Sequence, residues 1–255
     1  MTIPRPEYPR PILYRSDWKN LNGQWAFDYD PDDLGLIENW YQGHEYGKTI
    51  LVPFTVESEA SGLHDTSPPD VIWYEREFEH PGWLSEKVLV NFGACDYETR
   101  VFINGLEVGQ HRGGYSPFSF DITHVLNKGS NRITVRVQDS NSWMQPRGKQ
   151  EGTTRWPIDY DSVTGIWQTV WLEPVNTDHI TEIAASYEME TEELSLTLGL
   201  STHFYGELEV NLQQDGSIIA TQLTQCDGRS EVRVILKMDN PDLWSPADPR
   251  LVDVK

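Results

Sequence analysis

The side chains best placed to do chemistry lie in one long irregular stretch, residues 139–164. It carries two carboxylates, Asp159 and Asp161, together with the cation of Lys149. A neighbouring cation keeps a carboxylate ionised, and an ionised carboxylate accepts hydrogen bonds from hydroxyl groups but has no proton to donate. These residue types therefore predict a binding role in this stretch rather than a general-acid role.

The run PRGKQ in the same stretch supplies further polar groups, from Arg147, Lys149 and Gln150. One interpretation is that they contact a ligand or an adjoining domain. The other is that the cations form salt bridges with Asp159 or Asp161 inside the loop. The residues alone leave these two alternatives open.

The length of this stretch also favours function. A loop this long inside a compact β domain is uncommon, and such loops more often have a function than serve only as connections. The alternative is a disordered surface loop. Three large aromatic residues, Trp143, Trp156 and Tyr160, argue against disorder, because disordered segments contain few aromatics.

Other candidate residues have simpler explanations. Glu57 and Glu59 would face the same side of a strand, but 40 acidic residues make such pairs common by chance, and we expect a solvated acidic edge. His111 and Tyr115, in GQHRGGYSPF, have no nucleophile nearby in sequence. We expect that run to form a tight structural corner.

We expect no cofactor and no metal. The two cysteines, Cys95 and Cys226, and the seven scattered histidines match no zinc spacing. The acidic run DYDPDD at 28–33 could supply oxygens to a calcium ion, but it does not match an EF-hand loop, and we expect a solvated turn. Far apart in sequence, the cysteines are expected to be buried free thiols.

Composition excludes some partners. The net charge of −20 makes nucleic acid and anionic lipid poor partners, because both require a positive surface. No apolar run is long enough to span a membrane. Residues 1–15 lack the apolar core of a secretory signal, so we expect a cytoplasmic protein.

Period-two alternation along the chain predicts an all-β fold. Residues 88–92, 101–103 and 133–137 alternate apolar and polar side chains, as half-buried strands do. Asn104-Gly105 predicts a tight hairpin turn, because both residue types tolerate positive φ angles. Many short strands with Gly, Pro and Asn turns indicate a sandwich or jelly roll.

The pattern changes near Pro174, which predicts a jelly-roll domain at 1–174 and a second domain at 175–255. Alternation at 194–200, 208–212 and 232–236 suits an immunoglobulin-like sandwich. Such a domain usually takes about 100 residues, so we expect this one to be truncated before its last strand or two. An unpaired sheet edge tends to pair with another chain, which makes a homo-oligomer possible.

A series of sequence blocks resembles, in order, the N-terminal part of glycoside hydrolase family 2, the β-galactosidases and β-glucuronidases. The resemblance covers most of residues 8–174 and continues more weakly to the end. The blocks are YPRPILYRSDWKNLNGQWAFDYD, LVPFTVESEASG, VIWYEREF, FGACDYETRVFINGLEVGQHRGGYSPFSFDIT and TGIWQTVWLEPV.

The resemblance implies a jelly roll that binds sugar, an immunoglobulin-like sandwich and a (β/α)₈ barrel holding two catalytic glutamates. In the family one of these glutamates follows an asparagine, and this sequence contains no Asn-Glu dipeptide and no barrel pattern. The implied role is the non-catalytic N-terminal portion of a retaining exo-β-glycosidase. The alternatives are a free-standing carbohydrate-binding module without hydrolase activity and a purely structural or partner-binding pair of sandwiches.

The resemblance also assigns roles to the loop. Asp159 lies six residues before Gly165, the spacing at which an aspartate of these enzymes reaches into the sugar pocket of the barrel. Asp161 would take this role if the loop register differed. The implied partners are a terminal β-linked sugar and the chain's own catalytic barrel, with Arg147, Lys149 and Gln150 approaching the same pocket.

Overall fold

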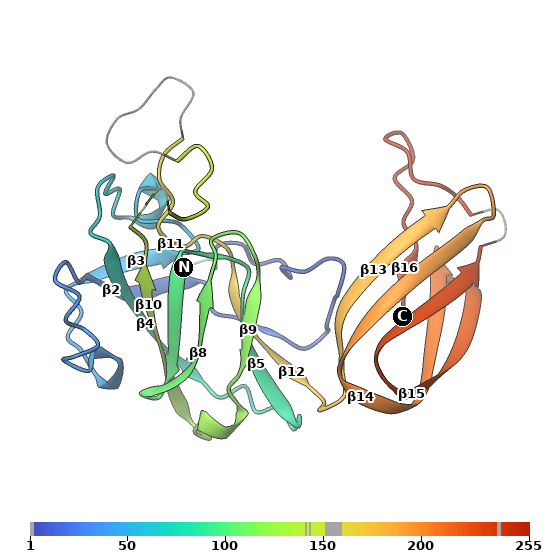
Figure 1. Cartoon of the computed structure of the whole chain (residues 1–255), viewed down its shortest axis with the longest axis horizontal. Helices are drawn as coiled ribbons and strands as arrows, with labels where there is room; N and C mark the ends of the chain where they lie inside the picture. The colour runs from blue at the N-terminus through green and yellow to red at the C-terminus, as the bar shows by residue number, and fades with distance from the viewer. Residues whose placement is uncertain (1–2, 141, 143, 151–159, 239–240) are drawn as a thin grey trace. The chain divides into compact units, whose positions relative to one another are not determined.

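The computed structural model describes residues 3–140, 142, 144–150, 160–238 and 241–255. The chain divides into a first unit, Met1–Pro9 with Tyr14–Val175, and a second unit, Arg10–Leu13 with Asn176–Lys255. Strands make up nearly all the regular structure of the described residues, and none of their helices is long and apolar enough to cross a membrane. The all-β class is confirmed, with a jelly-roll sandwich followed by a second β unit (Figure 1).

The first unit is built from antiparallel sheets. The six-stranded sheet has the order β3 (Lys48–Val52), β2 (Gly23–Tyr29), β4 (Val71–Glu79), β10 (Ser130–Gln138), β7 (Glu98–Ile103) and β8 (Leu106–Arg112). The four-stranded sheet has the order β1 (Lys19–Asn20), β12 (Val170–Val175), β5 (Lys87–Phe92) and β9 (Phe118–Asp121). A small third sheet pairs β11 (Gly165–Ile166) with β6 (Cys95–Asp96). Short 3₁₀ helices lie at η1 (Trp40–Gln42), η2 (Glu59–Ser61) and η3 (Thr123–Val125).

The core of the first unit follows the predicted alternation. On β5 the side chains of Val88, Val90 and Phe92 are buried, and on β10 Ile133, Val135 and Val137 are buried with them in one cluster. The Asn104-Gly105 turn joins β7 to β8 with positive φ angles at both residues, 51° and 81°. The hydrophobic alternation therefore determines which side chains face the core, and the Asn-Gly turn determines where the hairpin reverses.

A second, smaller apolar cluster lies apart from this core, where Val71, Trp73 and Phe102 alternate with the core-facing residues of their strands. The segment 31–47, which we call the cover segment, packs against it through Leu36, Trp40, Tyr41 and Tyr46. The aromatic residues of this cluster therefore have a packing role between the cover segment and the sheet.

Asp30 holds the start of the cover segment. Residues 31–33 are exposed, as expected of a solvated turn, but Asp30 itself is buried. Its carboxylate is 2% exposed and accepts hydrogen bonds from the backbone N–H of Leu34 and Gly35, both at 2.8 Å. The indole Nε1 of Trp73 donates to it at 2.9 Å. Three donors compensate the carboxylate for lost water, so it can be buried.

The second unit has longer strands than the alternation predicted. Its sheet has the order β13 (Ile180–Glu188), β14 (Glu193–Gln214) and β15 (Ser217–Lys237), with β16 (Asp253–Val254) also paired to β14. The runs 194–200 and 208–212 lie in the single strand β14, whose pairing with β15 shifts register between Gly199 and Tyr205. The immunoglobulin-like assignment of this unit stays a prediction.

A buried glutamate ties the N-terminal segment to the first unit. Glu173 on β12 is 0% exposed, and it accepts hydrogen bonds from Tyr8 Oη at 2.5 Å and Trp171 Nε1 at 2.6 Å. Arg15 Nε donates to its other oxygen at 3.1 Å, which completes an ion pair. Such an arrangement is costly to break, because removing one partner leaves the others unsatisfied.

We therefore predict that Glu173→Ala lowers the free energy of unfolding of the first unit by about 3 kcal/mol. Urea unfolding followed by tryptophan fluorescence measures this, because Trp244 is the only tryptophan after Val175. Glu79→Ala is the matched control, since Glu79 is exposed on β4 and its loss should cost less than about 0.5 kcal/mol. Equal losses for the two variants would contradict the account.

Candidate functional site

The structure describes four of the five predicted site residues, and Asp159 lies outside the described residues. Lys149 and Asp161 are exposed, and Gln150 is 8% exposed. The backbone N–H of Tyr160 donates to the carbonyl oxygen of Lys149 at 3.1 Å, which brings the two sides of the loop together. The run PRGKQ and Asp161 therefore lie at the same part of the loop. Residues that contribute to one binding site must lie close together in this way.

Arg147 is half-buried, and its carbonyl oxygen accepts a hydrogen bond from the backbone N–H of Gln150 at 3.2 Å. This bond closes a turn around Gly148, whose φ is +61°. The turn orients the Gln150 side chain inward while leaving Lys149 in solvent. The roles of the Arg147 and Lys149 side chains stay predictions.

Gln150 anchors the loop to the sandwich. Its amide Nε2 donates to Tyr115 Oη at 3.0 Å, and its Oε1 accepts from the backbone N–H of Val163 at 2.7 Å. The side chain also lowers the pKa of the Asp96 carboxyl, against the larger effect of burial. One buried amide thus joins both sides of the loop to the corner that carries Tyr115.

Tyr115 belongs to the site as well as to the corner that the sequence predicted. It lies 35 positions before Gln150, and no local pattern signals their contact. Its ring meets that of Trp167 edge-on, with centroids 6.4 Å apart, and Trp167 Nε1 donates to the carbonyl oxygen of Gly114 at 2.8 Å. Tyr115 is 54% exposed and Tyr160 is 65% exposed, so both rings can contact a ligand.

Three buried carboxylates lie beneath the loop: Glu57 is 7% exposed, Asp96 is 2% and Asp139 is 6%. Thr164 joins two of them, since its backbone N–H donates to Glu57 Oε2 at 3.2 Å and its hydroxyl to Asp139 Oδ2 at 3.4 Å. Gln145 Nε2 donates to the other oxygen of Asp139 at 2.5 Å. The carboxylates therefore fix both ends of the loop.

The expectation for Glu57 and Glu59 was wrong about the strand and about the exposure of Glu57, and right about the exposure of Glu59. Neither residue lies on a strand: Glu57 is in a turn and Glu59 begins η2, so they do not share a face. Glu59 is exposed, but Glu57 is buried against Thr164. The sequence did not reveal this because the partner of Glu57 lies 107 positions away.

Burial changes the acidity of this group. Burial first, and then the carboxylates of Asp139 and Glu57, raise the pKa of Asp96 to about 7, against a smaller lowering by Gln150. Burial likewise raises the pKa of Glu57. Neither Asp96 Oδ1 nor Glu57 Oε1 has a hydrogen-bond partner in the described part of the chain. The charged form of each carboxyl therefore lacks a stabilising donor at that oxygen, which agrees with a raised pKa.

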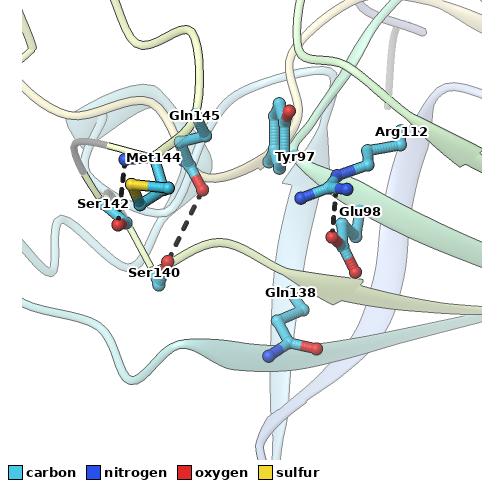
Figure 2. A pocket seen from close by; sticks show the side chains of 8 residues that line it. All are labelled: Tyr97, Glu98, Arg112, Gln138, Ser140, Ser142, Met144 and Gln145. Carbon is cyan, nitrogen blue, oxygen red and sulfur yellow. Dashed lines mark hydrogen bonds and ion pairs between the residues drawn. The ribbon is translucent and has the colours of Figure 1, made fainter.

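A polar hollow of about 120 Å³ opens beside Tyr97 and Glu98, the two residues that follow Asp96 in sequence (Figure 2). Arg112 Nε pairs with Glu98 Oε1 at 2.9 Å, and the guanidinium lies 5.5 Å from the centroid of the Tyr97 ring. The described residues lining the hollow are Tyr97, Glu98, Arg112, Gln138, Ser140, Ser142, Met144 and Gln145. Gln145 also contacts Asp139, so the hollow adjoins the carboxylates at the base of the loop.

This arrangement is suited to binding. The exposed groups are a cation, a carboxylate and aromatic rings, which can hydrogen-bond hydroxyls and cover an apolar face of a ligand. The three carboxylates are too buried to transfer a proton to a ligand above the loop. In the described ranges, no group of three His, Cys, Asp or Glu side chains is arranged to hold a metal ion.

Comparison with known families gives a match over most of the first unit. Residues 18–174 match the family described as "Glycosyl hydrolases family 2, sugar binding domain". A β-galactosidase from Thermoanaerobacter pseudethanolicus is 26% identical over 95% of this chain and 32% of its own length. A β-glucuronidase from Paenibacillus borealis is 29% identical over 94% of this chain and 42% of its own length. The chain thus spans less than half of each relative.

Solved structures show the same fold. The β-glucuronidase from Ruminococcus gnavus in complex with D-glucuronic acid superposes with a TM-score of 0.75 at 20% identity, over 97% of this chain and 44% of that one. A β-glucuronidase from an uncultured Clostridium species superposes with a TM-score of 0.74 at 22% identity, over 97% and 43%. At this level of identity the likeness concerns the fold.

The raised pKa of Asp96 predicts a pH-dependent stability. An acid whose pKa rises on folding binds more protons in the folded state, so stability falls as pH rises from about 4 to about 7. Asp96→Asn removes this dependence. We therefore expect the free energy of unfolding of the variant, measured against that of the parent chain, to be higher at about pH 8 than at about pH 5. Urea unfolding at both pH values measures the difference.

Asp121→Asn is the matched control. Burial raises the pKa of Asp121, but the hydrogen bonds from Thr123 together with the charges of Lys87 and His124 lower it more. Its net shift is therefore downward, and it is ionised at both pH values. The stability difference of that variant should therefore be the same at both. An Asp96→Asn difference that is likewise independent of pH would show that Asp96 is ionised beneath the loop.

Proposed function

Because the chain belongs to glycoside hydrolase family 2 through its sugar-binding domain, we propose that it is the N-terminal, non-catalytic portion of a retaining exo-β-glycosidase. The enzyme would be of the β-glucuronidase or β-galactosidase type and would cleave terminal β-glycosidic bonds. In it, the loop around residues 147–161 would line the sugar pocket, and the two β units would support a catalytic barrel.

The anchoring of the loop is the observation that carries this proposal. Gln150 and Thr164 hold the loop to buried groups of the sandwich, while Lys149, Asp161 and Tyr160 stay exposed. An anchored base with exposed polar tips is what a pocket-lining loop requires, because rigid placement lowers the entropy lost on binding.

The chemistry of the site supports a binding role without catalysis. A retaining glycosidase needs two carboxyls about 5 Å apart on either side of an accessible glycosidic bond. The raised pKa of Asp96 would suit a general acid, but its 2% exposure keeps it from such a bond. The family resemblance places both catalytic glutamates on the barrel instead.

A free-standing carbohydrate-binding module is the second candidate. The exposure of Tyr115 and Tyr160 favours it, since aromatic rings beside polar groups can hold a sugar without any help from a barrel. Calorimetry on the purified chain separates the candidates. Micromolar affinity for a monosaccharide would favour the module, and weak or undetectable binding would favour a pocket shared with a barrel.

We predict that the purified 255-residue chain does not release nitrophenol from nitrophenyl β-galactoside or nitrophenyl β-glucuronide. The reason is that its site carboxylates Glu57, Asp96 and Asp139 are buried. Absorbance of nitrophenolate measures this, with a complete family 2 enzyme as the positive control. Turnover that co-purifies with the chain through successive columns would contradict the proposal.

In a longer protein that carries this chain and a barrel, we predict that Asp159→Asn lowers kcat/KM about 10- to 100-fold, as expected for losing hydrogen bonds to a charged group. If the register differs, Asp161→Asn has this effect instead. The melting temperature should stay within about 1 °C, since Asp161 is exposed.

Asp32→Asn, an exposed aspartate of the cover segment, is the control and should change neither quantity. A loss of stability without a loss of kcat/KM would make the loop aspartates structural. Sequencing the gene beyond the codon for Lys255 gives an independent test, because a (β/α)₈ barrel with an Asn-Glu pair should follow. A stop codon directly after it would favour the binding module.

A further inference from the structure

A second hollow, of about 460 Å³, lies at the turn end of the β7–β8 hairpin. We call it the hairpin groove. Its lining residues are Leu36, Tyr41, Gln42, Arg100, Phe102, Gly105, Leu106 and Glu107. The loop site adjoins Asp96 and Glu98, at the other end of β7. Since a strand rises about 3.3 Å per residue, six residues of β7 separate the two sites by roughly 17 Å.

Stacked rings form the rigid wall of the groove. Tyr41 stacks on Phe102 with centroids 4.6 Å apart and planes 13° from parallel, and Phe102 in turn lies 6.1 Å from Trp73. The hydroxyl of Tyr41 donates to Asn39 Oδ1 at 2.7 Å. Tyr41 is therefore held in one position before any ligand arrives, which reduces the entropy lost on binding.

The polar wall of the groove is an ion pair across β7 and β8. Arg100 Nε donates to Glu107 Oε1 at 3.1 Å, and its Nη2 donates to Oε2 at 2.5 Å. Both side chains are about one-third exposed, at 33% and 34%. The pair carries no net charge, yet it presents unused N–H donors beside carboxylate lone pairs.

Leu106 completes the groove with an apolar surface. It follows the Asn104-Gly105 turn, and it is 58% exposed although it is a large hydrophobic residue. The groove thus combines an apolar patch, an ordered aromatic ring and a polar pair that both donates and accepts. A ring with one apolar face and hydroxyls at its edge matches all three, because each hydroxyl is itself a donor and an acceptor.

We propose that the hairpin groove binds a neutral saccharide of two or more sugar units. Its volume falls within the range of about 300 to 1,000 Å³ typical of small-ligand sites. A protein partner would need an interface of about 800 Å² per side, which these eight residues do not supply. An acidic ligand is disfavoured, because the Arg100 cation is neutralised by Glu107 and the chain carries a net charge of −20.

This site goes beyond the proposed function and does not depend on it. A groove at the far end of β7 would hold a second portion of a glycan, or another chain of a polysaccharide, while the loop site serves the terminal sugar. Binding here would raise the local concentration of substrate without taking part in hydrolysis. The two sites can therefore be tested separately on the same chain.

The test is nuclear magnetic resonance of the isotopically labelled 255-residue chain, titrated with lactose, cellobiose and, separately, sodium glucuronate at millimolar concentrations. We expect a neutral disaccharide to shift the amide signals of Tyr41, Gln42 and residues 100–107. Glucuronate should leave those signals in place.

Leu106→Ser and Glu107→Gln should each weaken the binding about tenfold, as expected for losing an apolar contact or a charged hydrogen bond. Asp121→Asn is the matched control. Asp121 forms a similarly exposed cross-strand pair with Lys87 at 3.7 Å and lines neither hollow, so its variant should bind normally. Because Leu106 is exposed, its variant should keep the parent melting temperature and remain informative if Glu107→Gln is destabilised.

Several outcomes would overturn the proposal. One is no shift at the groove with either disaccharide. Another is equal weakening by Asp121→Asn and Glu107→Gln. A third is a shift confined to Tyr115 and Gln150, which would place the sugar at the loop site and leave the groove without a ligand. Failure here would not affect the loop proposal, which rests on Gln150 and Thr164.

Discussion

The return of the long loop to the sheet is the constraint on which the site depends. Thr164 donates to Glu57 through its backbone and to Asp139 through its hydroxyl, and the next residue, Gly165, pairs with Asp96. Gly165 has a φ of +88°, and a side chain there would overlap the hydroxyl of Tyr74. Only glycine can therefore follow Thr164 at this point. This junction fixes the end of the loop against the sheet.

Holding the loop through buried carboxylates has a cost in stability. Asp96 and Glu57 each keep one oxygen without a partner in the described residues, and burial raises the pKa of both. Perturbed acids of this kind cluster at functional sites. In this chain they act as positioning residues, because they contact the loop and lie beneath the surface that a sugar would touch.

The sequence predicted those features that depend on neighbours along the chain. Alternation located the core-facing residues of β5 and β10, and Asn104-Gly105 located the hairpin turn. The length and aromatic content of residues 139–164 indicated the loop, and PRGKQ and Asp161 do lie together there. These signals are local, since strand periodicity and turn chemistry are set within a few residues.

Features that depend on distant partners were not predictable in this way. Glu57 and Asp30 are buried because donors from remote strands satisfy them, and Tyr115 joins the site through Gln150. In the second unit, alternation found the apolar faces but did not show that the runs 194–200 and 208–212 form one strand, because strand continuity depends on pairing with β15. The position of a buried polar group follows from tertiary contacts rather than from pattern.

The most direct measurement is a crystal structure of a longer protein that carries this chain, with a non-hydrolysable β-glycoside bound in its active site. We expect at least one side chain of residues 147–161 to lie within hydrogen-bond distance, about 3 Å, of a hydroxyl or carboxylate oxygen of the sugar. A bound sugar whose every polar contact comes from residues beyond Lys255 would contradict this expectation.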